Sequence, residues 1–194
     1  MTVSPATSPS PAGAPPATAG TAQASAAAAT GAAAESSPNA GLKVDAGLLD
    51  VLPSRIDGVP LEPDPTTAAQ IAADPTLADS AEAIAVALAI HPGTSSTGDD
   101  LAIVSVIRLR PGVFGEAWYS NWRTTYDQGA CDVAGGVRGE PTQVTIGGRT
   151  VYIGTCAGDA KTYHVRLADP ALIVSITAAG SRNFGELVVS GLAE

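Results

Sequence analysis

Two histidines, His91 and His164, are the side chains best suited to general-base chemistry, because imidazole titrates near neutral pH. His91 follows an apolar segment that we expect to be helical, where a protonated ring would stabilise the helix C-terminus. His164 shares one side of an expected strand with Thr162 and Arg166. Neither histidine lies in a GxSxG or HExxH motif. We therefore interpret His164 as a structural histidine, and a hydrolase base near Tyr152 or Arg166 is the alternative.

Carboxylates are the next candidates for chemistry, and they gather early in the sequence. Residues 45–100 hold ten acidic side chains and only Arg55 as a base, in a chain with a net charge of −9. Asp57 and Asp64 stand beside glycine or proline, which is typical of turn residues whose short side chains bond nearby amides. Such acids could form a glycosidase pair or a calcium site by chance, but no DxDxDG-type loop is written here. We predict no metal site and no cofactor.

The acidic balance and the motifs exclude several classes of partner. Phosphate binding depends on clustered lysine and arginine, so nucleic acid is not an expected partner. The pairs Gly135–Gly136 and Gly147–Gly148 form neither GxGxxG nor a P-loop, which argues against nucleotides. No run of about eighteen apolar residues occurs, so we expect no transmembrane segment. The expected partner is an unidentified envelope component or a small ligand.

Cys131 and Cys156 are the two cysteines of the sequence, and they could close a loop of about 26 residues. In the chain-entropy model a bridge of that span contributes roughly 3.5 kcal/mol. We predict this structural disulfide and, with it, an oxidising compartment. Two buried free thiols in a cytosolic protein are the alternative.

Residues 1–41 have almost no large apolar side chains and no aromatic ones, so they cannot bury enough surface to offset the entropy of ordering. We expect a disordered Ala/Pro/Ser/Thr-rich linker. Its composition resembles the tethers that separate lipid-anchored or surface-attached bacterial proteins from the membrane. The first five residues have neither the basic start nor the apolar stretch of a secretory signal. An extracytoplasmic location therefore requires a signal that has been removed; otherwise we expect a cytoplasmic protein.

A β-hairpin around Gly147–Gly148 is the clearest local signal, because both turn positions need a positive φ that glycine adopts without strain. The register pairs Val144 with Val151. In this register Cys156 lies on the face opposite to Val144. A bridge to Cys131 would then bring the preceding helix onto that face, so that both faces of the sheet are covered. The alternative is a bulge near Gly154 that turns Cys156 to the other face. The register places Val144, Ile146, Val151 and Ile153 on one face, and Thr145, Thr150, Tyr152 and Cys156 on the other.

Residues 42–194 are expected to form one α+β domain: an antiparallel sheet of about five strands, with a C-terminal meander, flanked by helices. Apolar residues at three- and four-residue steps predict the helices, and β-branched runs between turn residues predict the strands. The expected helical segments are 48–52, one from 66, 77–90, 114–128 and 183–192, and the expected strands besides the hairpin are 56–61, 101–109, 162–167 and 172–178.

Trp118, Trp122 and Tyr126 recur at steps of four and form an aromatic stripe along one side of the helix expected over 114–128. Packing of this stripe into the core is the main interpretation. An aromatic shelf for a ligand is the alternative.

These features favour a non-enzymatic extracytoplasmic module that binds a partner or a small ligand. A small hydrolase with His164 as its base would be favoured if His164 lay in a cleft beside an acid. A cytosolic scaffold or stress protein with a disordered arm would be favoured if the two cysteines lay too far apart to bridge. The expected binding surface lies between the acidic segment with Asp57 and Asp64 and the polar strand face with Tyr152, His164 and Arg166.

Overall fold

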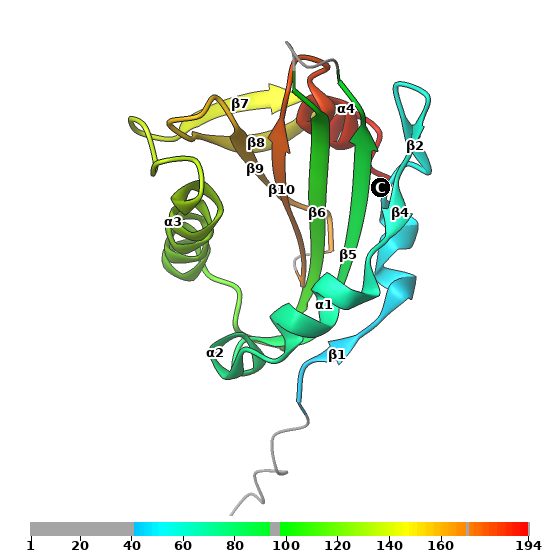
Figure 1. Cartoon of the computed structure of the whole chain (residues 1–194). Helices are drawn as coiled ribbons and strands as arrows, with labels where there is room; N and C mark the ends of the chain where they lie inside the picture. Colours follow the sequence, from blue (N-terminus) through cyan, green and yellow to red (C-terminus); the bar gives the residue numbers. More distant parts are fainter. Residues whose placement is uncertain (1–40, 94–97, 170, 194) are drawn as a thin grey trace, which may run out of the picture. The chain divides into compact units, whose positions relative to one another are not determined.

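An eight-stranded sheet with helices on both faces, together with a separate two-stranded sheet of β2 and β3, forms the part of the chain that the computed structural model describes, residues 41–93, 98–169 and 171–193 (Figure 1). The strand order is β1-β5-β6-β10-β9-β8-β7, and β4 also pairs with β5. The linker predicted over 1–41 lies outside the described residues except for Gly41. The strands are β1 (Lys43–Val44), β2 (Arg55–Ile56), β3 (Val59–Pro60), β4 (Glu62–Pro63), β5 (Ala81–His91), β6 (Asp100–Leu109), β7 (Thr142–Ile146), β8 (Arg149–Thr155), β9 (Lys161–Arg166) and β10 (Leu172–Ala179). The helices are the 3₁₀ helix η1 (Ala46–Val51), α1 (Pro65–Ala72), α2 (Pro75–Ala78), α3 (Glu116–Asp132) and α4 (Phe184–Ser190).

The predicted α+β class is confirmed, but the sheet has more than the five expected strands and is mixed. β1 runs parallel to β5, with Lys43 opposite Ala83. Within the described residues every other strand pair is antiparallel. The C-terminal meander is confirmed, because β7, β8, β9 and β10 pair in succession.

The hairpin of β7 and β8 has the predicted register, with Val144 opposite Val151. Gly147 and Gly148 have φ values of 57° and 79°, as the two-residue turn requires. β8 then pairs with β9 without a register shift through Gly154, so no bulge re-aims the following cysteine. Of the two alternatives for Cys156, coverage of both sheet faces is the one that the structure shows.

β5 is a central strand, and the helix predicted over 77–90 is therefore wrong. Only Pro75–Ala78 is helical in this region. The sequence of β5 alternates alanine with isoleucine, valine or leucine, and a period of two matches a strand. The alanine row leaves room for η1 on one face, while Ile84 and Val86 pack on the other face near α1. Pairing with β4 and β6 and burial on both faces outweigh the helix propensity of alanine.

The end of β5 also changes the interpretation of His91, which was expected to cap a helix. His91 lies opposite Asp100, the first residue of β6, so the helix-cap prediction is wrong. The Asp100 carboxylate accepts hydrogen bonds from the backbone N–H groups of Ser181 at 2.5 Å and Arg182 at 2.9 Å. These bonds fix the turn that leads into α4.

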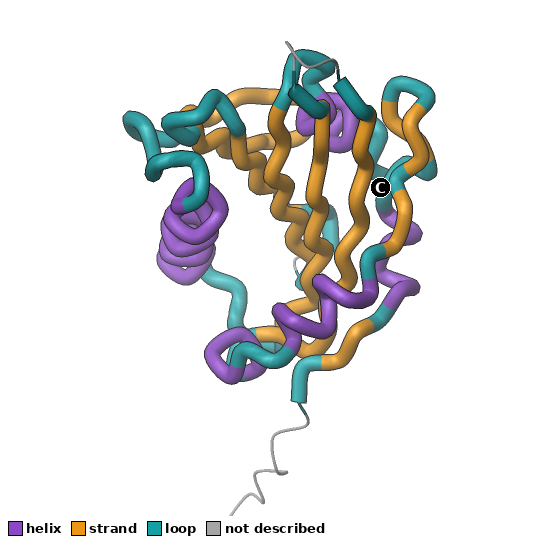
Figure 2. The backbone as a smooth tube through the Cα atoms, viewed as in Figure 1, coloured by secondary structure: helices purple, strands orange, loops and turns teal. Residues whose placement is uncertain are grey.

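The two faces of the sheet carry different helices (Figure 2). α4 and η1 pack on an apolar face, where Val104, Val174 and Ile176 are fully buried. α1, α2 and α3 lie on the other face, where the central strands also present serine, threonine and histidine. The predicted helices over 114–128 and 183–192 are confirmed as α3 and α4.

A disulfide joins Cys131, in the last turn of α3, to Cys156, which directly follows β8. The two Cα atoms are 5.0 Å apart, and both residues are fully buried. The predicted pairing is thus present, and it anchors one end of α3 to the sheet.

We expect the double variant Cys131→Ser, Cys156→Ser to lose about 3.5 kcal/mol of unfolding free energy, because a disulfide between residues 25 positions apart no longer constrains the unfolded chain. Urea unfolding followed by circular dichroism measures this loss. The reduced native protein is the matched control and should unfold at the same urea concentration as the double variant. Equal stability of the oxidised and reduced proteins would contradict the expected contribution.

Candidate functional site

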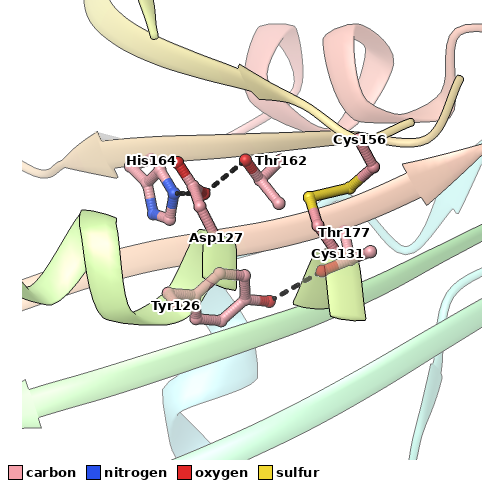
Figure 3. The surroundings of a disulfide bond; sticks show 7 residues. All are labelled: Tyr126, Asp127, Cys131, Cys156, Thr162, His164 and Thr177. Carbon is pink, nitrogen blue, oxygen red and sulfur yellow. Dashed lines mark hydrogen bonds and ion pairs between the residues drawn. A yellow bond between two sulfur atoms is a disulfide. The ribbon is translucent and has the colours of Figure 1, made fainter. Parts of the chain in front are cut away.

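Polar side chains join the C-terminal half of α3 to the sheet, next to the disulfide (Figure 3). Asp127 points from α3 to β9, where its Oδ1 accepts hydrogen bonds from Thr162 Oγ1 at 2.5 Å and from His164 Nε2 at 2.8 Å. The preceding residue, Tyr126, also reaches the sheet, and its hydroxyl lies 3.1 Å from Thr177 Oγ1 of β10. The helix is therefore fixed by directional bonds as well as by packing.

The Asp127 interaction continues into a chain of buried groups. His164 Nδ1 lies 3.0 Å from Ser175 Oγ, and the Trp122 indole donates to the same oxygen from 3.1 Å. Because an indole N–H can only donate, the hydroxyl of Ser175 is free to donate to Nδ1. The tautomer with its proton on Nε2 then satisfies His164 on both sides.

Asp127, His164 and Ser175 follow the same order as the triad of serine hydrolases, in which an acid orients a histidine that faces a serine. Here the three residues are only 4%, 1% and 0% exposed, and Trp122 covers the serine. In this arrangement the series of hydrogen-bonded side chains satisfies buried donors and holds α3 against the sheet.

Gly154 makes the close approach of Asp127 possible. A Cβ atom at this position of β8 would lie 2.6 Å from Asp127 Oδ2 and would also collide with the Thr162 hydroxyl. The carboxylate therefore sits where a side chain of β8 would otherwise be. A strand glycine often marks such an approach of another group.

A pocket of about 400 Å³ lies beside the first turns of α3, against β8 and the end of β9. Aromatic rings and arginine side chains form much of its lining. The Arg166 guanidinium lies 4.7 Å from the centroid of the Phe114 ring and 3.7 Å from Glu116 Oε1. Both partners of that ion pair are largely exposed, 47% for Arg166 and 76% for Glu116, so water screens it. The guanidinium remains available to a ligand.

Tyr152 and Tyr119 form the aromatic wall of the pocket, with their rings edge to face at 6.0 Å. Arg123 stacks on Tyr152 with its guanidinium carbon 3.5 Å from the ring centroid. Within the described residues, no carboxylate lies at ion-pair distance from Arg123. The wall is therefore aromatic and locally positive in a chain whose overall charge is negative.

The Tyr119 hydroxyl is a polar group without a partner. Tyr119 is 3% exposed, and in the described part of the chain its oxygen makes no hydrogen bond. Burial raises the pKa of this phenol well above its usual value, and the nearby Arg123 charge opposes the rise. The hydroxyl therefore stays protonated, and its oxygen lies beneath the solvent-accessible surface.

Three of the five residues expected to form a binding surface come together, and two do not. Tyr152 and Arg166 line the pocket, and His164 lies buried on the same face of β9. Asp57 instead forms an ion pair with Arg182 before α4, and Asp64 caps α1.

Asp64 and the aromatic stripe show what the local patterns encode. The Asp64 carboxylate accepts from the Thr67 N–H at 3.0 Å and from the Thr67 hydroxyl at 2.7 Å, and these bonds lower its pKa. Trp122 and Tyr126 bond to the sheet, as the core-packing interpretation of the stripe predicts, while Trp118 and Trp122 stay half-buried and also line a hollow.

Sequence reasoning missed Tyr119, Arg123 and Asp127. All three lie on α3 at steps of four from one another, which places them on one side of the helix. The steps of four are the signal that could have found this side of the helix.

Comparison of the chain with models of protein families, with curated proteins and with solved structures found no match. Among the described residues, no helix is long and apolar enough to cross a membrane. The same residues contain no group of three or more His, Cys, Asp or Glu side chains placed to hold a metal ion. The fold and the site thus define an α+β domain with a disulfide-anchored helix and an arginine-aromatic pocket beside it.

We expect Asp127→Ala to lower the free energy of unfolding by about 3 kcal/mol or more, because Thr162 and His164 would each lose a buried partner. Urea unfolding measures the loss. Asp132→Ala is the matched control on the same helix, since Asp132 is exposed, and it should change stability by less than about 0.5 kcal/mol. A loss at Asp127 no larger than that at Asp132 would contradict the role of the buried chain.

Proposed function

We propose that this domain is a non-enzymatic extracytoplasmic binding module, and that its pocket beside α3 takes a small organic anion. The observation that carries the proposal is the exposed Arg166 guanidinium over the Phe114 ring, in a pocket whose wall is formed by the rings of Tyr152 and Tyr119. A cation and a planar apolar surface are the groups that a small anion with a ring needs. The volume of about 400 Å³ falls in the range of small-molecule pockets.

Arg166 supplies the charge for this interaction. A planar guanidinium can bind a carboxylate through two parallel hydrogen bonds, and such charge-assisted bonds are stronger than neutral ones. Glu116 competes for Arg166 only weakly, because their 3.7 Å pair is exposed to water. A ligand carboxylate that excludes water from the pocket would replace it.

The aromatic wall supplies the second part of recognition. Phe114 and Tyr152 line the pocket and offer apolar surface to a ring or a short hydrocarbon part of the ligand. Tyr152 is held by Arg123 on its face and by Tyr119 at its edge. Because these neighbours fix the ring, little side-chain entropy is lost when a ligand binds.

The disulfide and the composition of the tail support the extracytoplasmic location. Disulfides persist in oxidising compartments and are rare in the cytosol. Residues 1–41 have the composition of a flexible tether. Cysteines too far apart to bridge would have favoured the cytosolic alternative, and the bonded pair does not provide that support.

We expect 4-hydroxybenzoate to bind the domain at least tenfold more tightly than the neutral 4-hydroxybenzamide, because only the carboxylate engages Arg166. Arg166→Gln should remove most of this preference, since a charged hydrogen bond is worth about tenfold or more in affinity. Calorimetric titration measures both effects. Arg138→Gln is the control, because Arg138 lies outside the pocket and bonds to the Ala157 carbonyl. The proposal is contradicted if both probes bind equally, or if neither binds at millimolar concentration.

A small hydrolase is the second candidate, and the Asp127–His164–Ser175 chain is the observation that favours it. In such an enzyme His164 would take the proton of Ser175, and Asp127 would hold the imidazole in its tautomer. Hydrolysis would require α3 to move, because Ser175 is fully buried beneath Trp122.

A fluorophosphonate probe tests this second candidate directly. A hydrolase would be labelled at Ser175 in the native state, and Ser175→Ala would abolish the label. Heat-unfolded protein is the control, since labelling there would not depend on the chain of hydrogen bonds. Absence of native-state labelling would eliminate the hydrolase.

A further inference from the structure

A second hollow of about 290 Å³ lies on the other side of α3 from the arginine-aromatic pocket, between α3 and α2. Its apolar lining comes from Trp118 and Trp122 of α3, Leu77 of α2 and Ile71 of α1. We call it the tryptophan groove. No lining residue is shared with the arginine-aromatic pocket, so the two can be tested separately.

The two indoles present carbon surface to the tryptophan groove. Their planes are within 9° of parallel, and their centroids lie 5.9 Å apart. The Trp118 N–H donates to Ser80 Oγ at 3.4 Å, and the Trp122 N–H donates to Ser175 Oγ. Since both polar edges are already bonded to the protein, what a ligand meets is the apolar part of each ring.

The rim of the groove offers uncharged hydrogen-bonding groups. Asn121 and Thr125 are exposed residues of the lining, and in the described part of the chain their side chains make no hydrogen bond. Arginine and lysine are absent from the lining residues described. The one lining carboxylate, Asp74, already accepts from the Thr76 N–H and hydroxyl. The groove is therefore unsuited to an ion and suited to a neutral polar ligand.

We propose that the tryptophan groove binds a pyranose unit of a neutral glycan. A pyranose ring has a face of C–H groups that packs on an aromatic surface and hydroxyl groups at its edge that need donors and acceptors. Trp118 and Trp122 match the C–H face, and the amide of Asn121 and the hydroxyl of Thr125 match the edge. A hydrocarbon chain would use the indoles but would gain nothing from the exposed amide and hydroxyl of the rim. This inference is independent of the proposed anion site.

Tryptophan fluorescence reads this groove selectively, because the chain has two tryptophans and both line it. The native protein is titrated with cellobiose, maltose and N,N′-diacetylchitobiose. We expect a saturable change in intensity and a shift of emission to shorter wavelength with at least one of them. Sorbitol is the ligand control, since it carries hydroxyl groups but no ring face, and it should produce no saturable change.

Asn121→Ala tests the rim, and we expect it to weaken binding about fivefold, as loss of one hydrogen bond does. Gln128→Ala, an exposed position of the same helix outside the groove, should bind like the native protein. Unfolding midpoints of both variants establish that the fold is intact. No saturable response to any disaccharide, an equal response to sorbitol, or an unchanged affinity of Asn121→Ala would each overturn the inference. Failure of the Arg166 experiment would leave it unaffected.

Discussion

The buried carboxylate of Asp127 is the constraint on which the arrangement of the α3 face depends. It is taken out of water and must be compensated, and Thr162 and His164 of one strand do so from 2.5 Å and 2.8 Å. Only a strand residue without a side chain, Gly154, lets the carboxylate come so close. Removing the Asp127 carboxylate would take the bonded acceptor from both Thr162 Oγ1 and His164 Nε2, so these bonds define the position of the helix on the sheet. The disulfide from Cys131 then fixes the end of the same helix covalently.

With its C-terminal half fixed in this way, α3 divides its face of the sheet into two hollows of different chemistry. On one side, Arg166 and Tyr152 give a positive, aromatic pocket. On the other, Trp118 and Trp122 give an uncharged groove. Both kinds of site need side chains whose positions are set before a ligand arrives, and the polar anchoring of the helix supplies that order. The opposite face, packed with α4 and η1, is an apolar core that supports the sheet.

Local signals made parts of this structure predictable, and long-range contacts made other parts unpredictable. The β7–β8 hairpin was predicted in its register because the glycine pair at its turn determines the backbone over a few residues. β5 was mistaken for a helix because apolar residues recurring at three- and four-residue steps were given more weight than a period of two that was also visible in the sequence. The short parallel pairing of β1 leaves no periodic trace, so the mixed sheet was missed. Asp127 was missed because its partners lie 35 and 37 residues away, and nothing local marks a carboxylate that will be buried.

Nuclear magnetic resonance of the native protein tests the central claim, that the hollow beside the first turns of α3 is a ligand site. The ¹⁵N-resolved signals of backbone amides and arginine Nε–H groups are followed during titration with 4-hydroxybenzoate. We predict saturable shifts of the Arg166 Nε–H and of the Tyr119 and Tyr152 amides, with the signals of Lys43 and Arg138 unmoved. Shifts confined to those two distant cations, or spread evenly over all arginines, would contradict the account, because they would show charge attraction without a site.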